Sequence, residues 1–502
     1  MTGSIARLAA RPALALLTAA VLLVPGVASS ARTGLSTAPA APTHLYLVTL
    51  DGPGTAALAA VGAPPPVYRW RTALDGVAVR LTAAQADALA AQPDVALVER
   101  DRVHPLAGTR RPVARPGTSW PARLHDLPRA RGGAGVVVGV VDTGIDPESP
   151  LFSDAPGLGR GPRGFTGDCL AGGGFAPAGC GRKLVAARWY AAGFGEERVR
   201  SAEALSARDH HGHGTQVASI AAGNPGLSVR VDGRRYGRFA GTAPQARVAA
   251  YKACWTAPDP DADGCSTADL VAAVDDAVAD GVDVLTLAVS SHGGLDTLQR
   301  ALLGAAEADV VVVAAAGNGG AREFAGHTSP WGTTVGAASR ARREARLLGP
   351  GLAVTGASAA RSAVAPAPLV VGADVPAPGS APSDARICAP GSLDAARVAG
   401  AVVVCERGDV GRVDKSEAVR RADGAGMVLV NVGPGSTYPD FHSVPTVHLG
   451  AAGAERLRTW LADHPDGRVE IEPLGRRRSA PGVASWSSGG DPAASLVKPD
   501  LV

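Results

Sequence analysis

Lysine is scarce in this sequence, with only four residues at Lys183, Lys252, Lys415 and Lys498 among 49 basic residues. The chain has no long basic run, and its formal net charge is only +3. Nucleic-acid-binding proteins concentrate positive charge in such runs or faces. The composition therefore argues against a nucleic-acid partner.

After residue 31, no apolar run approaches the roughly 20 residues that a membrane-spanning helix needs. Residues 1–31 combine Arg7 and Arg11, an apolar run from Ala13 to Val24, and a small-residue exit. This pattern predicts a secretory signal peptide, with an uncleaved anchor or a buried helix as alternatives. We expect an exported, extracellular protein that makes no membrane contact after signal removal.

The six cysteines include no Cys-x-x-Cys pair, which argues against a zinc site. They fall into three local pairs: Cys169 with Cys180, Cys254 with Cys265, and Cys388 with Cys405. An even count, close spacing and export favour disulfides, each contributing about 2–3 kcal/mol for loops this short.

A histidine-rich stretch from Asp209 to Asn224 runs into small apolar residues, so a polar loop is expected to place His213 on the first turn of a buried helix. Gly212 and Gly214 would let a substrate or partner group approach the imidazole closely. Three interpretations stay open at this point: His213 as a general base, a metal site, or a helix-capping loop. The metal site would use Asp209, His210, His211 and His213.

The β-branched run Val136–Val141 predicts a buried parallel strand that ends at Asp142. Open α/β sheets build their sites at such strand ends. A second buried strand, 310–316, precedes Asn318, and helices are expected at 268–280 and 298–308. The alternating order predicts an α/β fold with a parallel sheet and flanking helices.

These motifs resemble those of subtilisin-like serine proteases (subtilases, peptidase family S8) with a protease-associated insert. The matching stretches are Val140 to Ile145, Gly212 to Ser219, Gly241 to Pro244, and Ala315 to Asn318. The resemblance implies that Asp142 orients the imidazole, His213 is the general base, and Asn318 donates to the oxyanion. It also implies a protein or peptide substrate, bound in part by Ser290, Ser291, Gly293 and Gly317, although the sequence 290–294 departs from the family's usual pattern.

Residues 44–104 predict a small α+β unit, with strands at 44–50, 74–81 and 95–99 and a helix at 82–91 capped by Thr82. The unit is interpreted as either a plain N-terminal domain or an inhibitory prodomain, and the resemblance favours a prodomain that inhibits its own chain. Residues 105–121 are rich in proline, glycine and arginine and predict a linker with a processing site.

The remaining divisions are a first catalytic part at 122–345, a protease-associated insert at 346–475 and a catalytic continuation at 476–502. Within the insert, strands are expected at 398–404, 426–430 and 444–449, with helices at 415–423 and 453–461. The insert has no catalytic constellation, so a rigidifying spacer and a binding module remain equal alternatives.

A serine nucleophile is not identified in the 502 residues. The family's Gly-Thr-Ser-Met-Ala turn is missing, and Gly117-Thr118-Ser119 precedes the acid and lacks Met-Ala after it. We expect a sequence truncated before its nucleophile, hence inactive as it stands, with a catalytically dead pseudoprotease as the alternative and a metal hydrolase as a more distant one.

No cofactor is expected to be required, and the protein is expected to be a monomer. Asp259, Asp261 and Asp263 alternate in a loop and are either calcium ligands or merely solvated.

Overall fold

A computed structural model describes residues 41–52, 54–104, 131–231, 234–259, 262–289, 294–320, 323–408, 410–433, 437–484, 486–491 and 494–502. The chain divides into two units, Met1–Pro42 and Thr43–Val502. The signal peptide predicted at 1–31 and the linker predicted at 105–121 lie outside the described residues. None of the helices in the described ranges combines enough length and apolar character to cross a membrane.

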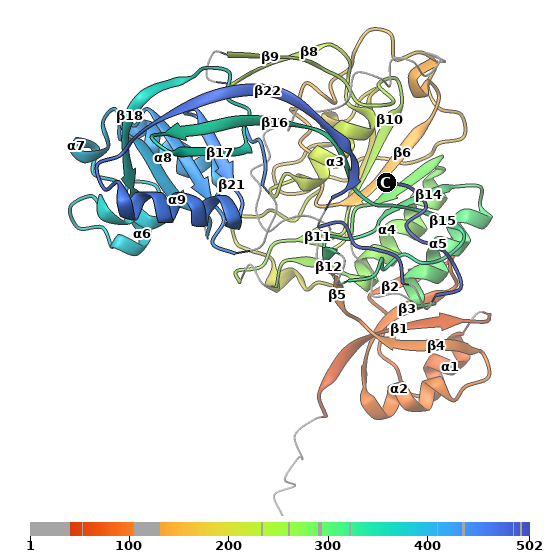
Figure 1. The fold of residues 1–502 in the computed structure, drawn as a ribbon. Coiled ribbons are helices and arrows are strands. Elements are labelled where there is room, and N and C mark those ends of the chain that lie inside the picture. Colours follow the sequence, from red (N-terminus) through yellow and green to blue (C-terminus); the bar gives the residue numbers. More distant parts are fainter. Residues whose placement is uncertain are drawn as a thin grey trace, which may run out of the picture. The chain divides into compact units, whose positions relative to one another are not determined.

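A six-stranded parallel sheet forms the centre of the second unit, in the order β15-β14-β13-β6-β10-β7 (Figure 1). Its strands are β6 (Val137–Asp142), β7 (Leu184–Trp189), β10 (Arg247–Lys252), β13 (Val284–Leu287), β14 (Val311–Ala315) and β15 (Gly332–Val335). Every residue of β6 and β10 is buried, as expected for parallel strands covered on both faces. The predicted α/β fold with a parallel sheet is confirmed.

Three helices pack on this sheet: α3 (His213–Ala222), α4 (Thr267–Asp280) and α5 (Thr297–Glu307). The Ser266 side chain caps α4 by accepting from the Asp269 amide, and Asp296 caps α5 by accepting from the Gln299 amide. Gly281 ends α4 in the left-handed conformation (φ 84°), which costs glycine least. Most residues of α4 are buried, including its Leu and most of its Ala and Val side chains, so α4 packs as a core helix.

Residues 43–100 form a separate antiparallel sheet with order β2-β3-β1-β4. The elements are β1 (Thr43–Leu50), α1 (Thr55–Ala60), β2 (Tyr68–Trp70), β3 (Gly76–Thr82), α2 (Ala83–Ala90) and β4 (Val95–Arg100). Thr82 caps α2 as predicted, in a reciprocal capping box with Gln85. The sheet and helices enclose their own apolar core, which includes Val48, Val77 and Leu89.

The N-terminal sheet attaches to the parallel-sheet domain through carboxylates at helices α4 and α5. Asp101 accepts hydrogen bonds from Ala268 N at 2.9 Å and from Ser266 Oγ at 3.0 Å, and Glu99 accepts from Thr297 N at 2.6 Å. Unsatisfied amides at helix N-termini favour such anionic partners. In the other direction, Asp275 of α4 accepts from the backbone amides of residues 71–73.

The attachment of the N-terminal sheet is expected to weaken as pH rises. Burial raises the pKa of Asp101 from its ordinary 3.8 to about 6, because the loss of hydration outweighs the hydrogen bonds from Ala268 and Ser266, which by themselves lower the pKa. A carboxyl whose pKa is raised in the docked state binds its proton more tightly there, so this contribution to docking is complete below pH 4 and is lost as pH rises through 6. We expect a loss on the order of 1–3 kcal/mol between pH 4 and 7, measured by hydrogen exchange at residues 99–104.

Asp101→Asn should flatten this pH dependence, because the amide does not titrate. Asp87→Asn on the exposed side of α2 is the matched control and should leave it unchanged. An undiminished pH slope in Asp101→Asn would rule out this carboxyl as its source. Asp269 and Asp275 face the same junction, and burial raises the pKa of Asp269 to about 7 and also raises that of Asp275, so both contribute to a slope that remains.

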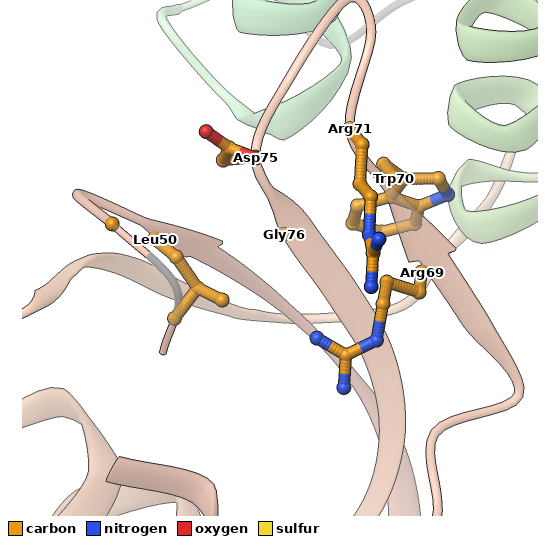
Figure 2. A pocket seen from close by; sticks show the side chains of 7 residues that line it. Leu50, Arg69, Trp70, Arg71, Asp75 and Gly76 are labelled. Carbon is orange, nitrogen blue, oxygen red and sulfur yellow. The ribbon is translucent and has the colours of Figure 1, made fainter. Parts of the chain in front are cut away.

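The N-terminal sheet also carries a pocket of about 290 Å³. Figure 2 shows Arg69 and Arg71 on one side and Leu50 and Asp75 across from them. Gly52, Trp70 and Gly76 complete the lining. None of the site residues predicted from the sequence lines this pocket.

Residues 338–483 form a closed barrel, with strand order β16-β17-β21-β20-β19-β18-β22. Its strands are β16 (Ala338–Gly349), β17 (Leu352–Ala357), β18 (Val364–Val371), β19 (Val402–Glu406), β20 (Gly426–Val430), β21 (Thr446–Leu449) and β22 (Arg468–Val483). Its helices are α6 (Pro382–Arg386), α7 (Ala395–Val398), α8 (Arg412–Arg421) and α9 (Ala451–Asp463). The barrel encloses its own core of Val, Leu and Ile side chains.

The predicted bounds of two elements in this region are wrong. The strand predicted at 398–404 begins at Val402, because Val398 ends α7 and Gly400 turns the chain with φ 72°. The helix predicted at 415–423 starts at Arg412 and ends at Arg421, since Asp423 has φ 56°. The pairing of β16 with β22 begins at Ala338 opposite Val483, and both residues lie outside the insert predicted at 346–475. The predicted domain divisions themselves stay predictions.

Three smaller strands and a hairpin complete the description. β5 (Val103–His104), β12 (Gly264–Ser266) and β11 (Cys254–Trp255) make a three-stranded sheet, and β8 (Leu227–Val231) pairs with β9 (Arg234–Phe239). The three predicted disulfides are confirmed, linking Cys169 to Cys180, Cys254 to Cys265 and Cys388 to Cys405. Cys254 and Cys265 lie directly opposite in the β11–β12 pair.

Candidate active site

A buried carboxylate and imidazole meet at the carboxyl edge of the parallel sheet. Asp142 is the last residue of β6, and His213 is the first residue of α3. Asp142 Oδ1 lies 2.7 Å from His213 Nδ1, with side-chain exposures of 0% and 10%. The carboxylate can only accept, so Nδ1 carries the hydrogen and Nε2 is the nitrogen able to take up a proton.

The two glycines beside His213 have local structural causes. Gly212 has φ 92°, a conformation that L side chains rarely adopt. A Cβ at position 214 would lie 2.3 Å from Gly144 O, so Gly214 lets the start of α3 pack against the turn after β6. The structure thus explains Gly212 by its backbone conformation and Gly214 by this packing, without an approaching substrate.

Asp209 organises the loop that delivers His213. Its Oδ1 accepts from His211 N at 3.0 Å and Gly212 N at 2.7 Å, and its Oδ2 accepts from Thr215 N at 2.9 Å and Thr215 Oγ1 at 2.6 Å. Bonding four donors from one short segment holds the loop in a single conformation. The sequence signal for this role is the polar residue shortly before a helix start, typical of a capping loop.

Thr143 joins the acid and base segments and was not identified from the sequence. Its hydroxyl accepts from Gly214 N at 2.8 Å and donates to Asp209 Oδ1 at 2.9 Å, while its own amide donates to Asp142 Oδ1 at 2.7 Å. One threonine thus connects the end of β6, the loop carboxylate and the start of α3.

The metal-site interpretation of Asp209, His210, His211 and His213 receives no support. Asp209 is occupied by backbone and hydroxyl donors, and His213 Nδ1 bonds Asp142. Across the described ranges, no group of three or more His, Cys, Asp or Glu side chains is arranged to hold a metal ion. The pKa of His211 is lowered, first by burial and then by the neighbouring His213, which favours a neutral ring at His211.

Asn318 lies beyond the end of β14, on the same edge of the sheet as Asp142. The register sets Val141 beside Leu287 and Leu287 beside Ala314, so the ends of β6 and β14 are level. With β13 between them, the two strands lie roughly 10 Å apart. Asn318 itself is half-buried.

The loop that contains Asn318 is held by the segment after β22. Ser488 N donates to Gly317 O at 3.1 Å, and Gly319 N donates to Ser488 Oγ at 3.1 Å. Gly317 has φ 109°, so glycine suits this turn. The carbonyl of Gly317 is therefore engaged in the structure, while its predicted role in substrate binding is not tested. Ser290, Ser291 and Gly293, the other predicted substrate-binding residues, lie outside the described residues.

Lys252 ends β10 directly opposite Asp142 and is fully buried. Its ammonium lies 2.5 Å from Glu203 Oε1 and 2.7 Å from Arg208 O, and 4.4 Å from the Trp255 ring centroid. Burial lowers its pKa. The bond to Arg208 O supports the chain immediately before Asp209. The only feature of the sequence that draws attention to Lys252 is the scarcity of lysine.

The predicted calcium ligands remain a prediction. Asp263 Oδ1 accepts from Ala257 N at 2.7 Å, which closes the loop between Cys254 and Cys265. Asp261 lies outside the described residues.

A parallel sheet with a buried acid–imidazole pair at its carboxyl edge is the arrangement of hydrolases that activate a nucleophile with a base. The model of the subtilase family matches residues 133–502, and that of the peptidase inhibitor I9 family matches residues 60–107. This chain belongs to the subtilase family.

Similar curated proteins include two from Arabidopsis thaliana. Subtilisin-like protease SBT1.5 is 35% identical over 493 residues, covering 92% of this chain and 61% of that protein. Subtilisin-like protease SBT1.4 is 35% identical over 462 residues, covering 87% of this chain and 57% of that protein. The chain thus spans about three fifths of the length of these relatives.

Solved structures give more distant matches. Fervidolysin from Fervidobacterium pennivorans, a keratinolytic enzyme related to subtilisin, is 19% identical with a TM-score of 0.38, covering 60% of this chain and 44% of that one. The epidermin leader peptide processing serine protease from Staphylococcus aureus is 19% identical with a TM-score of 0.38, and the match covers 59% of this chain and 70% of that one.

Proposed function

We propose that this chain is part of an exported serine endopeptidase that hydrolyses peptide bonds in protein or peptide substrates. The observation that carries the proposal is the buried 2.7 Å contact between Asp142 Oδ1 and His213 Nδ1. Membership of the subtilase family and the curated subtilisin-like protease relatives support it.

In the proposed reaction, His213 Nε2 takes the proton of a serine hydroxyl as that oxygen attacks the substrate carbonyl, and later gives it to the leaving amine. Asp142 holds the ring by accepting from Nδ1 and stabilises the imidazolium that forms. Residues 1–502 contain no Gly-Thr-Ser-Met-Ala turn, and we propose that the serine is contributed by residues outside them.

Asn318 is proposed to donate its side-chain amide to the oxyanion of the tetrahedral intermediate. Preorganised donors of this kind contribute about 3–4 kcal/mol to transition-state stabilisation. The rigid turn around Gly317, tied to Ser488, supports this role because it limits the motion of the neighbouring amide. Ser290, Ser291, Gly293 and Gly317 are proposed to line the substrate site.

Residues 44–104 are proposed to inhibit the same chain, and the match to the peptidase inhibitor I9 family at residues 60–107 supports this. Their hydrogen bonds to α4 and α5 are compatible with an intramolecular inhibitor. A signal peptide at 1–31, a protease-associated insert at 346–475, a monomeric state and optional calcium complete the proposal.

A fluorophosphonate probe tests the proposal. The 502-residue chain should not be labelled and should keep residues 44–104 attached, whereas a chain extended with a family-type Gly-Thr-Ser-Met-Ala segment should be labelled and should release them. Labelling is read by in-gel fluorescence, and processing by mass spectrometry of the intact protein.

His213-dependent labelling of the unextended chain would show that the nucleophile lies within residues 1–502. An extended, folded chain that resists labelling would favour the pseudoprotease alternative. Extension with Ala in place of the inserted Ser is the matched control, because it restores the same backbone without the hydroxyl.

A further inference from the structure

An arginine-rich ribbon joins the barrel to the parallel-sheet domain. β16 and β22 pair antiparallel from Ala338 opposite Val483 to Leu348 opposite Glu470, as two long neighbouring strands (Figure 1). Together they carry eight arginines and three glutamates, while the whole chain has a formal net charge of only +3. The arginines are Arg340, Arg342, Arg343, Arg346, Arg468, Arg476, Arg477 and Arg478.

The strand pairing sets arginine opposite arginine. Arg342 lies opposite Arg477, and Arg343 lies opposite Arg476. Directly opposed residues of an antiparallel pair share a face, and opposed like charges destabilise the pair. Without a ligand, the repulsion between opposed arginines lowers the stability of the ribbon. An anion bound between two such arginines would offset this repulsion.

The face with Arg342 and Arg477 also carries Glu344, two residues from Arg342 along β16, but Glu344 forms no ion pair with either arginine. Both arginine side chains are exposed. Arg342 Nη2 donates to Thr437 O at 3.4 Å and Thr437 Oγ1 at 3.2 Å, which are neutral acceptors. In the described parts of the chain, no carboxylate forms an ion pair with either arginine, and the ribbon's Arg346–Glu472 pair, at 3.4 Å, lies nearer the barrel.

The base of this ribbon is bonded to the candidate active site. Ala484 N donates to Ala337 O at 2.7 Å, and Ser488 just beyond it bonds Gly317 and Gly319 on either side of Asn318. Arg342 lies four residues along β16 from Ala338, or about 14 Å at the rise of an antiparallel strand.

We propose that the face of the β16–β22 ribbon bearing Arg342 and Arg477 binds an acidic segment of the polypeptide substrate, away from the bond that is cleaved. The proposal rests on the proposed endopeptidase function. It names a substrate class, polypeptides with clustered Asp or Glu. Polypeptide is favoured over other polyanions because the segment that follows the ribbon bonds, through Ser488, to the loop of Asn318, where a bound substrate chain would pass.

Fluorescence anisotropy of the 502-residue chain tests the proposal without requiring cleavage. The probe is a fluorescein-labelled Gly/Ser peptide with a block of glutamates, compared with the same peptide carrying glutamines. We expect the acidic peptide to bind at least about fivefold more tightly, and the difference to shrink with added salt. Arg342→Gln/Arg477→Gln should remove the difference, and Arg342→Lys/Arg477→Lys should keep most of it.

Arg163→Gln/Arg397→Gln is the matched control, since it removes the same charge at two exposed arginines off the ribbon. It should leave the preference unchanged. The thermal midpoint of Arg342→Gln/Arg477→Gln should not fall, because a like-charge pair is removed. If both double variants lost the preference for the acidic peptide equally, the proposal would be overturned.

Competition experiments separate the other sources of negative charge. A single-stranded DNA oligonucleotide or phosphatidylserine vesicles that bind more tightly than the acidic peptide, through the same two arginines, would replace the proposal with a nucleic-acid or lipid surface. The binding measurement does not depend on the labelling test of the proposed function. A failure of the proposed protease activity can therefore be distinguished from a failure of the proposed acidic-peptide binding.

Discussion

Replacing His213 by alanine is expected to lower turnover by about a million-fold in a chain extended with the serine-bearing segment. Removing the base or the nucleophile of the subtilisin triad has an effect of this size, because the serine hydroxyl is then not deprotonated. Asp142→Asn should cost about ten-thousand-fold, because the amide favours the wrong imidazole tautomer. Hydrolysis of a chromogenic peptide measures both.

His211→Ala is the matched control for His213→Ala. The two rings are neighbours, with centroids 6.2 Å apart, but the Asp142 carboxylate bonds His213. The control should retain activity within about an order of magnitude. A loss as large as that of His213→Ala would contradict the assignment of the base.

Replacing Lys252 by methionine is expected to destabilise the chain by about 3–5 kcal/mol, because it leaves the Glu203 carboxylate buried without its cation. The lost bond to Arg208 O should also loosen the loop that begins at Asp209. Urea unfolding followed by tryptophan fluorescence measures the free energy of unfolding.

Two further variants control the Lys252 experiment. Lys252→Met/Glu203→Gln should recover much of the lost stability, since no buried charge is left unpaired. Arg346→Met disrupts the exposed pair with Glu472, whose side-chain exposures are 42% and 48%, and should change stability by less than about 1 kcal/mol. A Lys252→Met effect no larger than that of Arg346→Met would show that the Glu203 carboxylate tolerates the loss of its cation.

Much of the site was predictable because its signals are local. The buried run of β6 places Asp142 at a strand end, and the small residues after His213 predict α3. The Thr82 cap and the three disulfides depend on residues close together in the chain. Periodicity, capping and loop length act over short separations, so a pattern in one stretch is enough to predict them.

Boundary errors in the barrel arose where a positive φ overrode local preference. Gly400 turns the chain inside the strand predicted at 398–404, and Asp423 turns it at the last residue of the helix predicted at 415–423. Pattern reasoning is least reliable at such ends.

From sequence alone, the α/β order, the positions of Asp142 at a strand end and His213 at a helix start, and the cysteine pairs follow, because each depends on a strand, a helix or a short loop. Tertiary structure sets Thr143 between Asp142 and Asp209, pairs Lys252 with Glu203, and aligns Arg342 with Arg477. These partners are distant in the chain, and the register between strands that brings them together depends on the packing of the whole sheet or barrel.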